Sequence, residues 1–328
     1  HKEYRRQRQM CIRDRVRGRH HHRPRQSPPG HRRKAGRVSD QPHDAMTPPR
    51  TLLRVERGEA GRVLRELRAQ DFVFTVLERE QPSSRLVRIR FSGNGFLRTH
   101  APYPTMWVRL WFADRSGTGA GHQRAYTLVD PDVPTDTFWL EFAIHDGSAT
   151  AWALGAQPGD QVEASLYGSE PSLPGCDDVD HHLLVGDPAS LPAINSLLDA
   201  LSPAPTTLVL EWTHPDDRAL PVRLRDGDAL RWVRRERDGG ALLDAVDEVL
   251  ADLSQLGDPA LGRTCRGDRP NLLAVPADCP RVFAWGACDT VTTRALTKKL
   301  RAAGLAKNCV KTLGYWPVSY THLRAHET

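Results

Sequence analysis

Long apolar runs are missing from this chain of 328 residues. No stretch approaches the roughly 20 consecutive apolar residues that a membrane-spanning helix needs. The region around Met46, where we expect the native protein to begin, also lacks the basic and then apolar layout of a secretory signal. We therefore expect a cytoplasmic protein that does not insert into a membrane.

Paired cysteines and catalytic constellations are missing too. The 6 cysteines include no CxxC pair, so the sequence indicates neither a zinc site nor a disulfide framework, and we expect reduced thiols. The sequence also shows no triad of nucleophile, base and carboxylate, and no pair of catalytic carboxylates. It therefore predicts no protein-bound metal and no catalytic acid, base or nucleophile.

The two ends of the chain differ in composition from the rest. Residues 1–45 carry 14 Lys or Arg against 4 Asp or Glu and show almost no apolar periodicity. Opposite strands of one short DNA element can encode residues 9–14 and residues 318–323, and that element resembles a sequencing-library adapter. We interpret residues 1–45 as adapter or read-through sequence without ordered structure, and residues 317–328 as an adapter scar. The remaining 31 basic and 35 acidic residues give no reason to expect a nucleic-acid partner.

Residues 71–175 contain short segments in which apolar and polar residues alternate, which is the pattern of half-buried strands. After a helical extension over residues 46–70, with its helix at 52–68, we expect an antiparallel barrel of six strands. The strands are predicted at residues 72–77, 86–91, 106–112, 124–129, 138–144 and 161–166.

The pattern changes at residues 170–180, where prolines and aspartates interrupt it. Residues 180–316 then alternate between strands and helices, which predicts a doubly wound parallel sheet. We expect strands at residues 182–185, 207–212 and 281–285, and helices at 192–201, 242–253 and 290–303. The predicted fold class is therefore an N-terminal β-barrel followed by an α/β domain.

The segment around Arg124 combines three side chains that suit a flavin cofactor. We interpret Arg124, Tyr126 and Thr127 as sharing one face of a strand. The arginine can pair with a phosphate, the tyrosine can lie against a ring system, and the threonine can offer a hydroxyl to the edge of that ring. Farther along, Gly147 and Thr150 form a turn into a short helix, whose free N–H groups favour a pyrophosphate.

Four motifs in this order resemble the siderophore-interacting protein family, flavin-dependent ferric-siderophore reductases within the ferredoxin reductase superfamily. The resemblance covers residues 70–316 and rests on Arg-x-Tyr-Thr at 124–127, His145 with residues 147–153, a Gly-Asp-to-Pro-Ala-Ile turn at 186–194, and Gly-Tyr-Trp at 314–316. Pro188 and Ala287 depart from it, since the family has acidic residues there, and the expected adapter scar replaces the family's continuation after Trp316.

The resemblance implies two cofactors, FAD and either NADPH or NADH. FAD would lie on the barrel, with its phosphates and adenosine held by a strand and the following turn and its ring held by an aromatic and a hydroxyl. The residues assigned to FAD are Arg124, Tyr126, Thr127, His145, Gly147, Ala149 and Thr150, with Trp316 near the flavin. The nicotinamide cofactor would dock at strand ends that carry Gly186, Asp187, Ser190, Gly286 and Ala287.

The implied function is an NAD(P)H-dependent, FAD-containing ferric-siderophore reductase. NAD(P)H would reduce the flavin, which would pass single electrons to the chelated iron, and Fe(II) would leave because hard oxygen donors favour Fe(III). We expect a monomer whose partner is an anionic ferric siderophore, bound by Arg88 and Arg90. Two alternatives stay open: a related flavin reductase that passes electrons to another acceptor, and a non-catalytic flavin-binding module.

Overall fold

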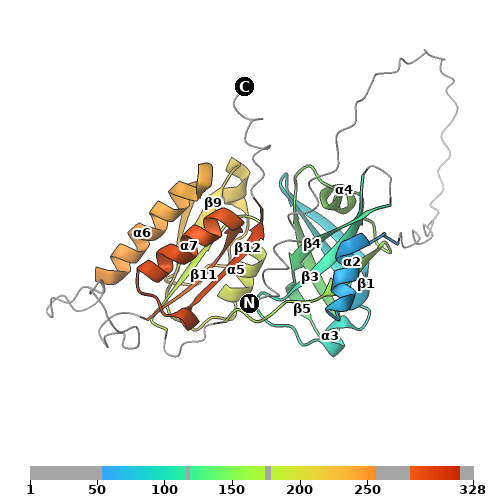
Figure 1. Cartoon of the computed structure of the whole chain (residues 1–328), viewed down its shortest axis with the longest axis horizontal. Helices are drawn as coiled ribbons and strands as arrows, with labels where there is room; N and C mark the ends of the chain where they lie inside the picture. The colour runs from blue at the N-terminus through green and yellow to red at the C-terminus, as the bar shows by residue number, and fades with distance from the viewer. Residues whose placement is uncertain (1–53, 116–118, 174–178, 256–280, 318–328) are drawn as a thin grey trace, which may run out of the picture. The chain divides into compact units, whose positions relative to one another are not determined.

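The computed structural model describes residues 54–115, 119–173, 179–255 and 281–317. Two sheets organise this part of the chain, an antiparallel sheet followed by a parallel one (Figure 1). The expected adapter segment 1–45, residues 318–328 of the expected scar, and residues 174–178 of the expected domain boundary lie outside the described residues. No helix in the described ranges is long and apolar enough to cross a membrane.

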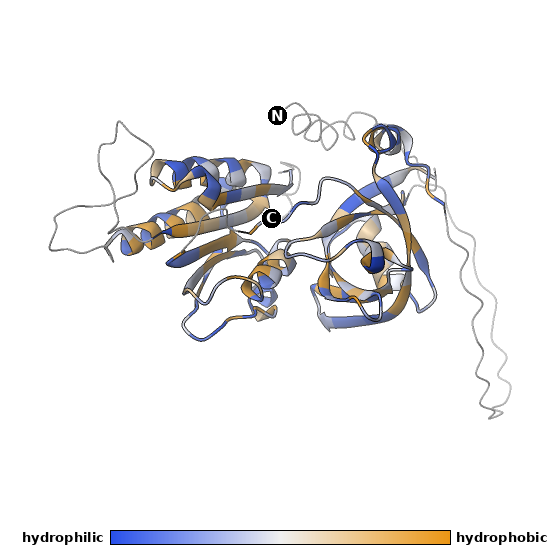
Figure 2. Ribbon diagram, turned by 90° about the horizontal axis from the view of Figure 1, so that it is seen from below, coloured by the Kyte–Doolittle hydropathy of each residue, from blue (hydrophilic) through white to orange (hydrophobic). Residues whose placement is uncertain are grey.

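Seven antiparallel strands form the first sheet, in the spatial order β4-β3-β7-β1-β2-β6-β5. The sheet curls around one apolar core, so the expected barrel fold is confirmed, with one strand more than predicted (Figure 2). The strands are β1 (Gln70–Ser83), β2 (Leu86–Ser92), β3 (Trp107–Ala113), β4 (Gly121–Thr127), β5 (Val129–Asp132), β6 (Thr137–Ala143) and β7 (Gln161–Leu166).

Alternation along the strands explains the core of the barrel. In β2, Val87, Ile89 and Phe91 are fully buried, while Arg88 and Arg90 between them are only half-buried. The additional strand arises because the chain leaves β4 at Leu128 and starts β5 one residue later. The hydrophobic pattern continues through this break, so the sequence predicted a single strand at residues 124–129.

Three short helices accompany the barrel: α2 (Gly58–Glu66), α3 (Phe96–Thr99) and α4 (Ser148–Gly155). Helix α2 is shorter than the expected helix at residues 52–68, of which residues 52 and 53 lie outside the described part. The helix starts later than expected because Glu56 forms an isolated bridge with Ala120, which holds the backbone before the helix in an extended conformation. Helix α4 follows the predicted turn at Gly147.

The second sheet has five parallel strands in the order β10-β9-β8-β11-β12. Its strands are β8 (His181–Gly186), β9 (Thr206–Trp212), β10 (Ala229–Arg234), β11 (Val282–Asp289) and β12 (Val310–Trp316). Strands β10 and β12 lie at the edges, are largely exposed or half-buried, and carry charged residues. They lack the apolar runs that predicted the inner strands, so the sequence did not indicate them.

Helices cover both faces of the parallel sheet, which confirms the doubly wound fold. In β8, Leu184 packs toward α5 (Leu191–Leu198), while Leu183 and Val185 pack toward α6 (Gly240–Gln255) and α7 (Thr290–Ala302). The chain first adds β9 and β10 on one side of β8 and then adds β11 and β12 on the other. The direction of winding therefore reverses between β8 and β11, and ligands of such sheets bind beyond the carboxyl ends of the strands at this point.

Two of the cysteines, Cys288 and Cys309, lie in the part of the chain that the structure describes. Cys288 in β11 is a free, buried thiol, as expected. Cys309 is disulfide-bonded, which contradicts the expectation that the cysteines are reduced.

Candidate functional site

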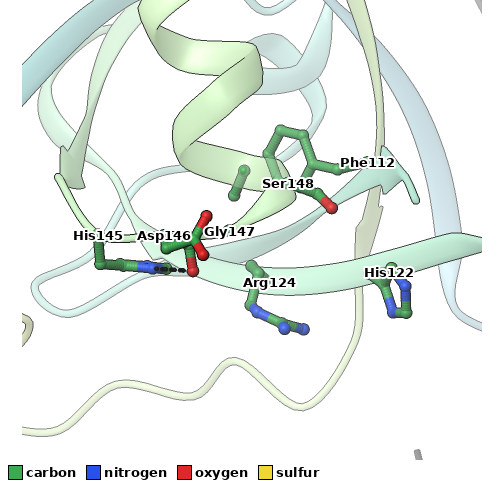
Figure 3. Close-up of a pocket in the computed structure, with 8 residues that line it drawn as sticks. Phe112, His122, Arg124, His145, Asp146, Gly147 and Ser148 are labelled. Carbon is green, nitrogen blue, oxygen red and sulfur yellow. Dashed lines mark hydrogen bonds between the residues drawn. The ribbon is translucent and has the colours of Figure 1, made fainter. Parts of the chain in front are cut away.

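A cavity of about 200 Å³ lies on the barrel, where β4 passes the start of α4 (Figure 3). Its lining brings together the two segments that the sequence singled out, the strand with Arg124 and the turn before α4. The lining residues are Phe112, His122, Arg124, His145, Asp146, Gly147, Ser148 and Ala149. The structure therefore places four of the residues assigned to FAD, Arg124, His145, Gly147 and Ala149, around one cavity.

Arg124 is the available cation of this cavity. Its side chain is exposed, and its guanidinium donates a hydrogen bond of 2.8 Å to the carbonyl oxygen of Gln123. Among the described residues, no carboxylate forms an ion pair with it, whereas Asp146 at the rim pairs with Arg115. Arg124 is thus free to bind an anion that enters the cavity.

The N-terminus of α4 forms the second anion-binding feature of the same cavity. Gly147 occupies the N-cap position and offers no side chain to cap the helix, and the first turn carries no acidic residue. The Thr150 hydroxyl donates instead to the carbonyl oxygen of Ala143 at 3.3 Å. The first N–H groups of this helix therefore lack a side-chain cap, and its dipole favours a negative charge.

The combination fits the pyrophosphate of a dinucleotide such as FAD. A guanidinium and a helix N-terminus that line one cavity offer charge and hydrogen-bond donors to phosphate oxygens. At about 200 Å³ the cavity accommodates only part of a molecule of that size. The rest of the cofactor would therefore extend over the neighbouring surface of the barrel.

Tyr126 shares a face of β4 with Arg124, two residues earlier, but Thr127 does not. Consecutive strand residues point to opposite faces, so the expectation that all three share one face was wrong. Tyr126 packs against Phe142, with 4.4 Å between ring centroids, and burial raises the pKa of its hydroxyl. Thr127 is buried, and its side chain is hydrogen-bonded to the Tyr315 hydroxyl.

Four lining residues were missed by the sequence analysis: Phe112, His122, Asp146 and Ser148. For His122 a signal was present, because it precedes Arg124 by two residues and so lies on the same face of β4, as Figure 3 shows. Its imidazole lies 4.0 Å from the carboxylate of Asp114. Phe112 comes from the neighbouring strand β3, and only the pairing of β3 with β4 brings it to the cavity.

The predicted nicotinamide residues also converge, at the point where the winding of the parallel sheet reverses. Gly186 and Ala287 are direct neighbours in the register of β8 and β11. Beyond Gly186, the Ser190 hydroxyl accepts a hydrogen bond from the Asp187 N–H at 2.9 Å and so fixes the turn into α5. Strand β11 extends farther than the predicted 281–285, so Gly286 and Ala287 lie within the strand.

Gly186 is required at this turn by the close approach of α5. A Cβ atom there would lie 2.8 Å from Ile194 Cδ1 and 3.2 Å from the carbonyl oxygen of Ala287, and it would also collide with the Ser190 hydroxyl.

We expect Gly186→Ala to lower the free energy of unfolding by about 2 kcal/mol, because overpacked sites shift their neighbours. Urea denaturation measures this. Gly155→Ala, where a Cβ meets nothing within 4 Å, is the control and should leave stability nearly unchanged. Equal stabilities of the two variants would contradict the close packing.

Three buried carboxylates, which we call the carboxylate cluster, lie at the carboxyl ends of β8, β9 and β11: Asp187, Glu211 and Asp289. Arg235 forms ion pairs with Glu211 and with Asp289, the latter at 3.0 Å. The Trp316 indole donates a hydrogen bond of 2.8 Å to Asp187, and the Arg235 guanidinium lies over its ring at 4.7 Å. Trp316 therefore contacts this cluster in the parallel-sheet domain.

The pKa values within the carboxylate cluster diverge. Burial raises the pKa of Glu211 to about 7, against the opposing effect of Arg235, and one of its oxygens, Oε1, is buried without a hydrogen-bond partner. Burial also raises the pKa of Asp187. Burial alone would raise the pKa of Asp289 as well, but hydrogen bonds from Thr292 outweigh it and lower that pKa. The cluster thus holds a carboxyl that binds a proton near neutral pH.

The two arginines assigned to the siderophore differ in their surroundings. Arg88 is placed 3.1 Å from Glu141, 3.4 Å from Asp130 and 3.7 Å from Glu80, so its charge is compensated. Arg90 donates a hydrogen bond of 3.3 Å to the Thr137 hydroxyl. In the part of the chain that the structure describes, no carboxylate forms an ion pair with Arg90.

Two family models match the chain, one over the second half of the antiparallel sheet and one over the parallel sheet. The Siderophore-interacting FAD-binding domain matches residues 117–166, and the Siderophore-interacting protein model matches residues 179–318. A solved structure of the siderophore-interacting protein from Acinetobacter baumannii is similar in fold, with a TM-score of 0.58 at 20% identity over 78% of this chain and 94% of that chain.

Curated relatives are similar in sequence over part of their length. The mycobactin import ATP-binding/permease protein IrtA of Mycolicibacterium thermoresistibile is 34% identical over 199 residues, which are 59% of this chain and 22% of that protein. The NADPH-dependent ferric-chelate reductase of Escherichia coli K12 is 28% identical over 179 residues, 54% of this chain and 59% of that protein. The chain thus spans about a fifth of the import protein and somewhat over half of the reductase.

The FAD-binding model covers β4 and α4, which line the cavity, and the second model covers the sheet whose strand ends carry the carboxylate cluster. The fold and both family models agree with the four motifs in the sequence. The chain belongs to the siderophore-interacting protein family.

Proposed function

We propose that the protein is an FAD-containing reductase that uses NAD(P)H to reduce the iron of a ferric siderophore in the cytoplasm, so that Fe(II) is released. The observation that carries this proposal is the barrel cavity, where Arg124 meets the uncapped N-terminus of α4. Family membership and the relative named as a ferric-chelate reductase support the choice of acceptor.

The barrel residues would bind and orient the flavin. Arg124 and the first turn of α4 would hold the phosphates, and His122 and His145 would flank them. Bound FAD supplies a ring system that accepts two electrons at once and passes them on singly. The nicotinamide cofactor would bind beyond the carboxyl ends of β8 and β11, near Gly186 and its register partner Ala287. Positioning of donor and acceptor is then the main contribution of the protein.

Arg90 is our candidate for docking the anionic chelate, because Arg88 already contacts three carboxylates. We expect Arg90→Glu to raise the KM for an anionic ferric siderophore by about 3- to 10-fold at low salt and to flatten its dependence on ionic strength. Steady-state kinetics at several salt concentrations measure both. Lys298→Glu, an exposed residue of α7, is the control. An unchanged KM in Arg90→Glu would remove Arg90 from the docking site.

The proposed function is tested by following the visible absorption of the bound flavin. The purified full chain is loaded with FAD, reduced with NADPH or NADH without oxygen, and mixed with a ferric siderophore in the presence of an Fe(II)-specific dye. We expect the visible flavin band to bleach and then return as the Fe(II) complex forms. A reduced flavin that returns only with free FMN or a ferredoxin would identify a reductase with another acceptor. Failure to bind FAD would identify neither reductase and would refute the proposal.

A further inference from the structure

Two arginines lie over one tryptophan at the carboxyl end of β9. Trp212 is the last residue of β9, and Arg234, its register partner, is the last residue of β10. Arg218 belongs to the short helix η1 (Pro215–Ala219) that follows β9. The guanidinium carbons of Arg218 and Arg234 lie 5.0 Å and 5.9 Å from the centroid of the indole ring. Both arginines are exposed, and Trp212 is half-buried.

These two guanidinium groups differ from their neighbours in having no counter-charge. Within the described residues, neither Arg218 nor Arg234 forms an ion pair. The other arginines between residues 218 and 235 all do: Arg223 with Asp130 and Asp199, Arg225 with Asp228, Arg231 with Glu248, and Arg235 with Glu211 and Asp289. Two positive charges on a single ring repel each other, and an anion between them would relieve that repulsion.

The acidic residues nearest Arg218 in sequence, Asp216 and Asp217, form other contacts. Asp216 accepts a hydrogen bond from the Ser84 hydroxyl at 2.6 Å. Asp217 is buried and accepts from the N–H groups of Thr213 and His214 at 2.9 and 2.8 Å. Both carboxylates of η1 are therefore engaged in holding the loop, and its arginine is left facing solvent.

The position of the pair matches one end of a bound dinucleotide. Strand β9 is the second strand of this sheet in chain order and lies directly beside β8. At about 4.8 Å between strands, the ends of β9 and β10 are one to two spacings from the point where the nicotinamide cofactor would bind. In dinucleotide-binding sheets, a carboxylate in this region binds the ribose hydroxyls of NADH, whereas an arginine accommodates the 2′-phosphate of NADPH.

The carboxylate of Glu211, near the end of β9, does not compete for this role. Glu211 is buried, and it forms an ion pair with Arg235. Its side chain is therefore withheld from a ribose at the surface. Arg218 and Arg234 remain exposed beyond these strands, and both lie over the half-buried Trp212 ring.

We propose that Arg218 and Arg234 bind the 2′-phosphate of NADPH, with Trp212 holding both guanidinium groups in place, and that the protein therefore prefers NADPH to NADH. The inference rests on the proposed function for the role of the coenzyme. Charge-assisted, bidentate bonds from arginine to phosphate supply the discrimination. NADH offers only hydroxyls at this position and gains little from the two charges.

The test measures binding of the full chain by calorimetry, without flavin or ferric chelate. The probes are 2′,5′-ADP, which carries the 2′-phosphate, and 5′-AMP, which lacks it. We expect 2′,5′-ADP to bind at least about 10-fold more tightly, and we expect Arg218→Ala with Arg234→Ala to abolish this difference. Lysine at both positions should retain part of it, because charge remains while the bidentate geometry is lost. Arg231→Ala, on the same strand β10 but paired with Glu248, is the matched control and should bind as the wild type does.

Several outcomes would overturn the inference. Equal affinity of the wild type for the two nucleotides would do so, as would a preference that survives in the double variant. Binding of inorganic phosphate as tightly as 2′,5′-ADP would show a general anion site instead of a coenzyme site. In steady-state assays the double variant should have a raised KM for NADPH and unchanged KM for NADH and kcat. If the protein reduces no ferric chelate, the binding data still decide this inference, so the two failures are distinguishable.

Discussion

Arg124→Glu is expected to weaken FAD binding by about 100-fold or more. A hydrogen bond to a charged phosphate contributes about 1.5–3 kcal/mol, and a reversed charge in the same cavity adds repulsion, so a loss near 3 kcal/mol corresponds to this factor. The folded state should be unaffected, because the Arg124 side chain is exposed and bonds only the neighbouring Gln123 carbonyl. Quenching of flavin fluorescence on titration with protein measures the affinity, and thermal denaturation of the FAD-free protein checks the fold.

Arg98→Glu provides the matched control for Arg124→Glu. Arg98 is an exposed arginine of the same domain and lies on α3, at the end of the barrel away from α4 (Figure 1). The same change of two charge units should leave FAD affinity within about twofold, because exposed charges at a distance are screened by salt. If both variants lost affinity equally, the effect would be one of net charge, and the assignment of the cavity to the FAD phosphates would be wrong.

The cavity could be predicted from the sequence because its parts are local. Arg124 and His122 lie two residues apart on one strand, and the turn at Gly147 leads directly into α4, so short-range spacing describes each part. What the spacing cannot give is the break at Leu128, because apolar residues continue through Leu128 and Val129 although the chain leaves the strand. The misplacement of Thr127 has a different cause, because Thr127 directly follows Tyr126 within β4 and the two-residue period already puts it on the other face.

The carboxylate cluster could not be predicted, because its members come from strands far apart in the chain. In the sequence, Glu211 and Asp289 are each an acidic residue after an apolar run, which does not indicate a site. Arg235 follows the edge strand β10, which has no apolar run. Their burial depends on the order in which β8, β9 and β11 pair. The sequence analysis instead noted two carboxylates that the family has and this chain lacks, at Pro188 and Ala287. The structure shows that the same sheet edge still holds three.

Glu211 should make the stability of the protein depend on pH around neutrality. Its pKa is about 7 in the folded protein, because of burial, against 4.5 as the ordinary value. A group whose pKa is raised by folding stabilises the folded state fully below the unfolded pKa, and this contribution is lost as the pH rises through the folded pKa. As the pH rises from 4.5 to above 7, the contribution of Glu211 alone should therefore lower the free energy of unfolding by about 3 kcal/mol.

Glu211→Gln isolates that contribution, since glutamine keeps the shape and cannot ionise. The stability of the variant relative to the wild type should rise by about 3 kcal/mol as the pH increases across this interval. Urea denaturation at a series of pH values measures the difference. Glu248→Gln, an exposed carboxylate paired with Arg231, should show a difference of less than about 1 kcal/mol at every pH.

The sign of the stability change in Glu211→Gln also tests whether burial or the ion pair with Arg235 dominates the pKa of Glu211. If the ion pair with Arg235 dominated over burial, Glu211 would be ionised throughout, and Glu211→Gln would be the less stable protein at high pH. The unpartnered Oε1 argues for burial, because an ionised carboxylate in a dry site needs bonds to both oxygens. Asp289 has such bonds, from Thr292, Val291 and Arg235. Arg235 contacts both carboxyl groups, but only Asp289 is hydrogen-bonded at both oxygens, so Glu211 is the group that takes up a proton as the pH falls through about 7.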